Sequence, residues 1–120
     1  NDCIETIIES CKDGVLASDI AKKAEKIIKP IRDKILFHDL YAYPVGIAFP
    51  PNWIENPNFY LSHSNDNKIR KGMVFHLPLT LRINGKYGAG FSETIIIKEE
   101  GAEKLSNLPR TLNPELYKLN

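Results

Sequence analysis

Apolar positions spaced three and four residues apart dominate the start of the chain and predict two helices. The first helix covers about residues 3–12, ends before Gly14, and has an apolar face formed by Ile4, Ile7, Ile8 and Cys11. The second begins at Ser18, whose side-chain oxygen can cap a free backbone N–H of the first turn. Its buried stripe consists of Ile20, Ala24, Ile27 and Ile28. Pro30 ends or kinks this helix, because proline donates no backbone hydrogen bond and its ring clashes with the preceding turn.

From Tyr41 the apolar positions alternate with other residues, a spacing typical of β-strands. A strand is predicted from Tyr41 to Phe49, before Pro50-Pro51. The stretch from Asn52 to Lys71 is rich in Asn, Ser and Pro and predicts a long loop, which in a compact domain is usually functional or disordered.

Two further apolar runs flank the dipeptide Asn84-Gly85. The runs are Met73–Ile83 and Tyr87–Lys98, and Asn-Gly is the dipeptide that best tolerates the positive φ angles of a type I′ hairpin turn. A short strand can follow at Ala102–Leu105. We therefore predict an α+β fold with two helices packed on an antiparallel sheet. The expected single domain spans residues 1–120, with helices in about 2–36, the sheet in about 41–105 and an extended tail in 107–120.

Composition and charge exclude several classes of protein. The 120 residues are enough for one domain, and 42% hydrophobic with 26% charged residues is the balance of a globular chain. A net charge of +1 gives no footprint for nucleic acid or an anionic membrane, and no apolar run is long enough for a membrane helix. Cys3 and Cys11 lie too far apart on one helix for a disulfide, so two reduced thiols and a cytoplasmic location are predicted.

Known motifs for metal or nucleotide chemistry do not occur in the sequence. The cysteines lack zinc-site spacing, and there is no Walker loop, dinucleotide fingerprint or nucleophile elbow. The Gly88-Ala89-Gly90 cluster lies inside the hairpin and indicates a bulge or a close backbone approach. Neither a metal nor another cofactor is therefore expected from spacing alone. The remaining candidates are Tyr43, Glu55, His63, Asp66, His76 and Glu93.

Each candidate also has a structural interpretation. His76 lies between two apolar residues and can be a hydrogen-bonded structural histidine. Glu93 precedes the apolar run 94–97, so its carboxylate must either face solvent or be paired in a pocket. Glu55 and Asp66 can be solvated loop acids. The residues alone do not choose among these interpretations.

Four phrases in the correct order resemble the pita-bread hydrolases, the family of prolidase, aminopeptidase P, methionine aminopeptidase and creatinase. These phrases are residues 46–55, 71–76, 92–97 and 103–110. The resemblance is to the C-terminal half of the pita-bread domain. It implies that the first half, with two metal-bridging aspartates, would lie upstream of this chain, either in a longer protein or on a partner.

The resemblance also locates the metal ligands that the family has in this half. The family's ligand histidine falls on Tyr43, one glutamate falls at Leu77-Pro78, and the last glutamate falls on Ser92 with Glu93 beside it. The family's second histidine, which contacts substrate, falls on Pro50. A di-metal site requires carboxylate or imidazole donors, so these residues imply no metal in this half.

The likeness is closer to the ectoine-hydrolase-like branch of Xaa-Pro dipeptidases, which shares the Pro-Pro-x-Trp-x-Glu phrase at residues 50–55. That branch implies catalytic acids at Glu55 and Asp66. The chain departs from it at Ile54, where the branch usually has glycine.

The leading hypothesis is a metal-independent hydrolase of an amide or cyclic amidine C–N bond. Its substrate would be a small amino-acid-like molecule or a dipeptide. Asp66 would act as nucleophile or anchor, with Glu55 and Glu93 as the acid/base pair. Tyr43, Trp53 and His76 would contact the substrate, and desolvation by Trp53 would raise one carboxyl pKa.

Two alternatives remain open: a catalytically inactive module that binds peptide or protein, and a fragment of a longer peptidase. An uncovered sheet face or edge also predicts a homo-oligomer or association with the missing half.

Overall fold

The computed structural model describes residues 1–47 and 59–113. Two α-helices open the fold, α1 (Asp2–Ser10) and α2 (Ala17–Ile28), and the short 3-10 helix η1 (Lys29–Lys34) follows α2 directly. Most of the apolar positions predicted from the sequence face the core, where the helices bury Ile4, Ile7, Ile20, Ala21, Ala24 and Ile28. Ile27, which was predicted in the buried stripe of the second helix, is instead 42% exposed near the end of α2. Proline is accepted at the start of η1 because the first N–H groups of a helix need no partner within it.

The predicted cap of the second helix is wrong. The N-cap is Leu16, and Ser18 is a buried residue inside the first turn of α2. The Ser18 hydroxyl donates a hydrogen bond to Oδ1 of Asp66 over 2.7 Å. A distant loop residue therefore uses the oxygen that the sequence assigned to local capping.

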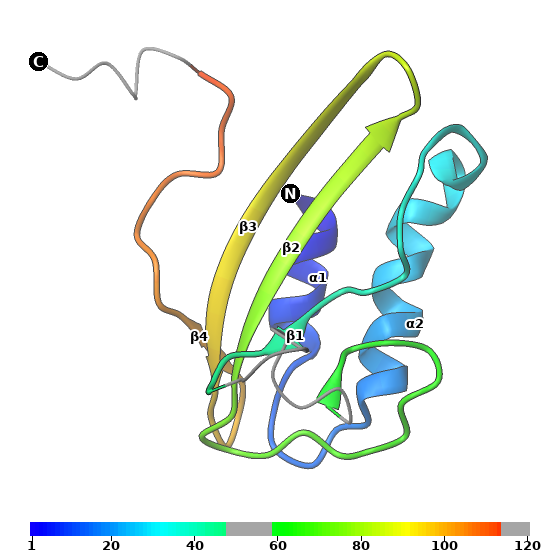
Figure 1. Ribbon diagram of the computed structural model, residues 1–120. Helices are drawn as coiled ribbons and strands as arrows, with labels where there is room; N and C mark the ends of the chain where they lie inside the picture. The colour runs from blue at the N-terminus through cyan, green and yellow to red at the C-terminus, as the bar shows by residue number, and fades with distance from the viewer. Residues whose placement is uncertain (48–58, 114–120) are drawn as a thin grey trace, which may run out of the picture.

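Four strands form one antiparallel sheet in the order β1-β2-β3-β4 (Figure 1). They are β1 (Tyr43–Pro44), β2 (Val74–Ile83), β3 (Tyr87–Ile97) and β4 (Ala102–Lys104). The strand predicted from Tyr41 is much shorter than expected within the described residues, because Ala42 pairs with Leu61 of the loop and only two residues pair with β2. Residues 48–49 of that prediction lie outside the described ranges.

The hairpin forms where the sequence predicts it, but its turn differs from the prediction. Ile83 pairs with Tyr87, so three residues and not two connect β2 to β3. Gly85 has a positive φ of 68°, whereas Asn84 does not, and a type I′ turn requires positive φ at both central positions. The Asn-Gly signal thus locates the hairpin without fixing its turn.

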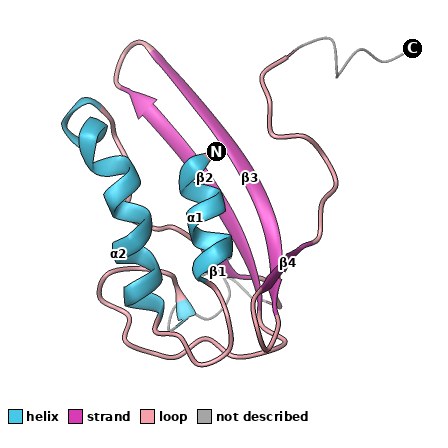
Figure 2. Ribbon diagram, turned by 180° about the vertical axis from the view of Figure 1, so that it is seen from behind, coloured by secondary structure: helices cyan, strands magenta, loops and turns pink. Residues whose placement is uncertain are grey.

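Both helices pack on one face of the sheet (Figure 2). Side chains alternate along the strands, and Phe75 and Leu77 of β2 and Ile95 and Ile97 of β3 are buried against the helices. We call the opposite surface the open face, since no described helix covers it. Its positions are Val74, His76, Pro78 and Thr80 on β2 and Gly90, Ser92, Thr94 and Ile96 on β3.

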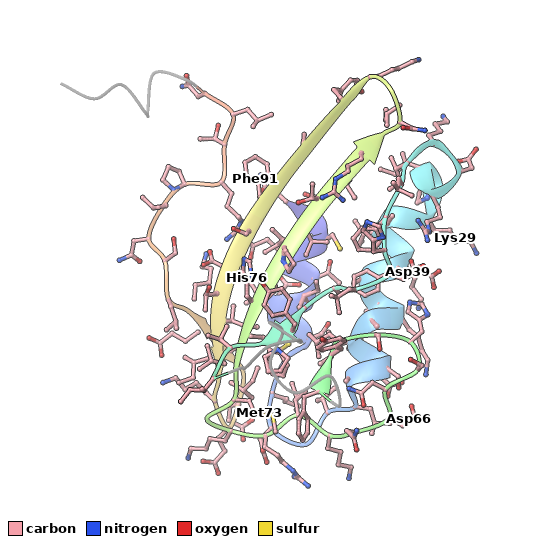
Figure 3. The ribbon with its side chains drawn as sticks, in the orientation of Figure 1. Lys29, Asp39, Asp66, Met73, His76 and Phe91 are labelled. Carbon is pink, nitrogen blue, oxygen red and sulfur yellow. The ribbon has the colours of Figure 1, made fainter. Side chains whose placement is uncertain are left out.

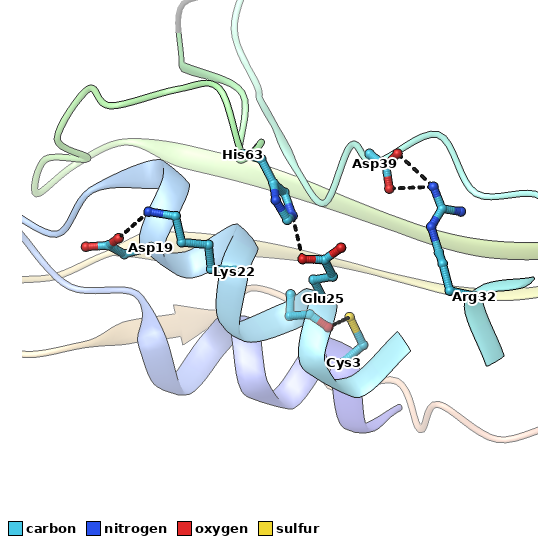
Figure 4. A network of polar contacts seen from close by, with 8 residues as sticks. Cys3, Asp19, Lys22, Glu25, Arg32, Asp39 and His63 are labelled. Atoms are coloured by element: carbon cyan, nitrogen blue, oxygen red, sulfur yellow. Dashed lines mark hydrogen bonds and ion pairs between the residues drawn. The ribbon is translucent and has the colours of Figure 1, made fainter. Parts of the chain in front are cut away.

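The loop after residue 58 is held against the start of α2 and the turn before it. Ser18 and Ala17 donate their backbone N–H groups to the carbonyls of Asn65 and Asn67, over 2.7 and 3.0 Å. On the side of α2, His63 lies 3.6 Å from Glu25 (Figure 4). These contacts place the loop over the helical layer.

Cys3 and Cys11 are free and buried, in agreement with the expectation of two separate thiols. Burial raises the pKa of Cys3 to about 11 and that of Cys11 to about 12, so both side chains are neutral. None of the described helices has the length and hydropathy needed to cross a lipid bilayer.

Candidate functional site

Tyr43 and His76 are the two sequence-predicted site residues that the fold brings together. They are paired positions on β1 and β2, and the Tyr43 hydroxyl lies 2.6 Å from Nδ1 of His76. Their rings meet edge to face, with centroids 5.0 Å apart and planes at 90°. Both side chains are half-buried. Burial lowers the pKa of His76, which favours the neutral imidazole.

The register settles which residue stands at the second family ligand position. Pro78 pairs with Ser92, and the pair follows Tyr43 and His76 along the open face. Leu77 lies on the other face and is fully buried against the helices. Of the positions to which the resemblance assigns the family's ligands, Tyr43, Pro78 and Ser92 lie on the same face of the sheet, and Leu77 does not.

These residues do not fit the metal pair that the resemblance implies. Two hydroxyls and a proline offer no carboxylate or imidazole to a cation, and the one imidazole on this face has its Nδ1 bound to Tyr43. Across the described ranges, no group of three His, Cys, Asp or Glu side chains is arranged to hold a metal ion.

Glu93 lies on the helix face, across the sheet from His76. Its side chain is 1% exposed, and Oε2 accepts a hydrogen bond from Nη1 of Arg110 over 2.6 Å. Oε1 accepts one from the backbone N–H of Thr94 over 3.0 Å. The other terminal nitrogen of Arg110 contacts Glu5 of α1. The carboxylate is thus buried and paired, and it joins the C-terminal segment to the core.

The remaining predicted acids are not beside the Tyr43–His76 pair. Asp66 is an exposed loop residue that lies beside the start of α2, where it contacts Ser18, and it is well away from His76 on β2 (Figure 3). Glu55 and Trp53, together with Pro50 and Ile54, lie outside the described residues.

Sequence reasoning missed two residues that determine this arrangement. Arg110 ends the family-like stretch 103–110, and a single arginine after Pro109 has no periodicity that would reveal its partners. Ser18 was assigned to a cap. A buried carboxylate at Glu93 is the one signal that could have led to Arg110, because an ionised acid in a core needs a cationic partner.

Comparisons with known proteins agree with this fold. The sequence matches metallopeptidase family M24 over residues 1–99. It is 34% identical over 112 residues to ectoine hydrolase of Halomonas elongata, covering 91% of this chain and 27% of that protein. The chain spans about a quarter of the length of the curated relatives that it matches.

Solved structures of low sequence identity share the fold. X-Pro aminopeptidase of Thermotoga maritima has a TM-score of 0.74 at 22% identity, over 92% of this chain and 30% of that one. Prolidase from Pyrococcus furiosus has a TM-score of 0.73 at 24% identity, over 91% and 31%. The N-terminal domain of the FACT complex subunit SPT16 from chickpea, Cicer arietinum, has a TM-score of 0.68 at 19% identity, over 86% and 26%.

Proposed function

Because the chain belongs to metallopeptidase family M24, we propose that the protein carrying it hydrolyses a C–N bond in a small amino-acid-like substrate. The bond would be an amide or a cyclic amidine, and this part of the protein would contribute no metal ligands. The observation that carries the proposal is the open face: the positions of the expected ligands hold Tyr43, Pro78 and Ser92, and a Tyr–His pair stands beside them. Similarity to ectoine hydrolase supports the substrate class.

The proposed roles of Trp53, Glu55 and Asp66 rest on the resemblance, and those of Tyr43, His76 and Glu93 rest also on their observed contacts. Tyr43 and His76 contact the substrate on the open face, and Trp53 is proposed as a further substrate-binding residue. Glu55 is the proposed general acid or base, and Asp66 is the proposed nucleophile or anchor. For Glu93 we propose a positioning role instead of proton transfer, since its two oxygens are occupied by Arg110 and the backbone of Thr94.

Asp66 would need to approach the open face in order to act there. Its side chain makes one hydrogen bond, with Ser18, but the carbonyls of Asn65 and Asn67 on either side also accept backbone N–H groups of α2, so this movement requires the loop to release those bonds as well. The variant Ser18→Ala tests this point, because it frees Asp66 without altering the acid. Unchanged turnover in Ser18→Ala is expected if Asp66 leaves Ser18 readily in the wild-type protein. Unchanged turnover in Asp66→Asn would exclude a catalytic role for Asp66.

The test is turnover of ectoine and Xaa-Pro dipeptides by the full-length protein, with and without a chelator. Metal-independent hydrolysis predicts unchanged rates after chelation. Glu55→Gln is expected to lower kcat by about 10²–10⁴-fold, the usual contribution of a general acid or base. Exposed Glu103 provides the matched control, since it pairs only with Lys98 on the surface, and Glu103→Gln should leave kcat unchanged. Activity abolished by the chelator would reject the metal-free mechanism.

A binding module without catalytic activity is the second candidate. It is favoured by the missing ligand donors and by the shared fold of a FACT complex subunit, whose name describes a component of a complex. Such a module would bind a peptide or protein and turn over none of the substrates. A peptide-binding assay beside the turnover assay separates the two candidates. Only a hydrolase turns over a substrate in the wild-type protein and loses that turnover in Glu55→Gln.

Association with further polypeptide is part of the proposal. β4 pairs with only the last three residues of β3, so the edge of β3 from Tyr87 to Ser92 pairs with no other strand in the described ranges. Unpaired edges favour association. We propose that the chain forms a homo-oligomer or contacts a preceding half-domain, and light scattering would measure the mass of the assembly. We also propose a cytoplasmic location, because two free thiols fit a reducing compartment.

A further inference from the structure

The short contact between Tyr43 and His76 bears on which imidazole nitrogen carries the proton. An N–H···O hydrogen bond normally spans 2.7–3.2 Å, whereas a bond donated by a hydroxyl is shorter. The observed 2.6 Å from Oη to Nδ1 therefore favours Tyr43 as the donor. The reverse arrangement would also leave the phenol O–H without an acceptor among the described residues. With Nδ1 as acceptor, the single proton of a neutral imidazole lies on Nε2.

Nε2 lies on the opposite side of the ring from Tyr43 and has no hydrogen-bond partner among the described residues. The nearest positions across the sheet are Thr94, which pairs with His76, and Ser92, two residues before it. Both carry hydroxyls. The neighbouring open-face positions on β2 and β3 therefore carry no charge: Thr94 and Ser92 offer hydroxyls, and Val74, Pro78 and Ile96 are apolar.

We infer that Tyr43 fixes His76 as an Nε2–H donor, and that this donor binds the carbonyl oxygen of an amide. The inference rests on the proposed hydrolase function and chooses between its two substrate classes. An amide carbonyl offers lone pairs to a neutral N–H. A cyclic amidine is protonated at neutral pH, so its ring offers only donors and a positive charge, which an N–H group repels.

The assignment gives different roles to the two residues. His76 contacts the substrate oxygen, and as charge grows on that oxygen during attack at the carbonyl carbon, the Nε2–H bond strengthens. Tyr43 is a positioning residue, which acts only through the tautomer and orientation of the ring. The imidazole keeps its proton throughout, so no proton is transferred in this contact.

The tautomer can be measured without any turnover. Full-length protein is labelled with 15N-histidine, and the His76 resonances are assigned by their loss in His76→Gln. The expected spectrum has an Nε2–H tautomer, which becomes a mixture in Tyr43→Phe. Tyr87→Phe is the matched control, because Tyr87 is 66% exposed near the hairpin turn. A predominant Nδ1–H tautomer in the wild-type protein would overturn the assignment.

Ligand preference is tested in the same spectra with N-acetylglycine, glycine and ectoine at equal concentrations. N-acetylglycine carries an amide, glycine carries only the charged ends, and ectoine carries a cyclic amidine. The His76 Nε2–H resonance should shift with N-acetylglycine alone. No shift with N-acetylglycine, or an equal shift with glycine or ectoine, would overturn the amide assignment.

Kinetics then separate this inference from the proposed function. For an amide substrate, His76→Leu should lower kcat by about 10²–10³-fold, the cost of losing one such donor, and His76→Gln should recover part of the loss through its own N–H. Tyr43→Phe should lower kcat more than it raises KM, and His38→Gln, on an exposed histidine, should change neither. If the protein turns over no substrate but shows the Nε2–H tautomer and the shift with N-acetylglycine, the proposed hydrolysis is refuted and the inferred amide-binding site is supported. Equal rates in His76→Leu and wild type would refute the role of His76 in turnover.

Discussion

Arg110 should be the residue outside the hydrophobic core whose loss destabilises the fold most. It lies on the segment after β4, and its guanidinium contacts Glu93 of β3 and Glu5 of α1. Its side chain is 12% exposed, against 1% for Glu93 and 44% for Glu5. One arginine therefore connects three parts of the chain that are far apart in sequence, and it neutralises a buried carboxylate.

The magnitude follows from what each substitution leaves behind. Arg110→Met keeps the apolar stem but leaves Glu93 buried with only the Thr94 N–H, and breaking a buried pair in this way costs about 3–5 kcal/mol. Nε of Arg110 is itself buried without a partner among the described residues, a cost of about 1–3 kcal/mol that the substitution removes. Taken at their midpoints, the two ranges leave an expected net loss of about 2 kcal/mol. Glu5→Gln should cost about 0.2–1 kcal/mol, because the Glu5 side chain is nearly half exposed.

Urea and thermal unfolding followed by circular dichroism would measure these differences. A loss of about 2 kcal/mol corresponds to a fall in Tm of roughly 8 °C for a domain of this size. Arg70→Met is the matched control, since Arg70 is 58% exposed and lies 3.8 Å from Asp13. The double variant Glu93→Met/Arg110→Met should regain most of the stability, because neither charge is then buried alone. The reasoning would be refuted if Arg110→Met cost no more than Arg70→Met.

Three further predictions concern the core and the sheet. Gly90→Ala should destabilise by about 1–3 kcal/mol in an unfolding assay, because its Cβ would lie 2.8 Å from a β2 carbonyl oxygen, whereas Gly101→Ala meets nothing and should be neutral. Cys3 and Cys11, whose pKa values burial raises to about 11 and 12, should not react with a disulfide reagent at pH 8 until urea unfolds the protein. Burial lowers the pKa of His76 below 6.5, so the folded protein binds a proton at His76 less readily than the unfolded chain does. The contribution of the neutral imidazole to stability should be complete above about pH 6.5 and should decline as the pH falls through the folded pKa. In unfolding measured against pH, His76→Gln should remove this decline.

The elements predicted best from the sequence are those whose signal is local. The helix stripes and the hairpin runs are set by periodicity within ten or twelve residues, and the observed elements begin and end close to the predicted positions. The strand from Tyr41 was too long because alternation cannot reveal that Ala42 pairs with Leu61. The Ser18 cap failed for the same reason: a hydroxyl at a helix start has a local partner and a distant one, and only the fold brings Asp66 close.

Site residues were predicted less completely, since a site depends on which face each side chain occupies. The sequence indicates Tyr43 and His76 as two separate candidates, and the strand register makes them neighbours. Glu93 was grouped with them although strand alternation puts it across the sheet, a conclusion available only once Leu77 is known to face the helices. The choice between a solvated and a paired Glu93 also depended on Arg110, seventeen residues further on.

Strand alternation also explains how the fold can persist while the expected metal ligands are replaced. Positions on the helix face, such as Phe75 and Ile95, are fully buried, and most substitutions there would cost several kcal/mol. Positions on the open face are half-buried or exposed, so exchanging a carboxylate for Ser92 or Pro78 costs the core little. Packing therefore constrains the residues on one side of these strands much more tightly than the residues on the other side. For this chain the fold is consequently a weak guide to chemistry, and the substrate has to be argued from Tyr43, His76 and the hydroxyls beside them.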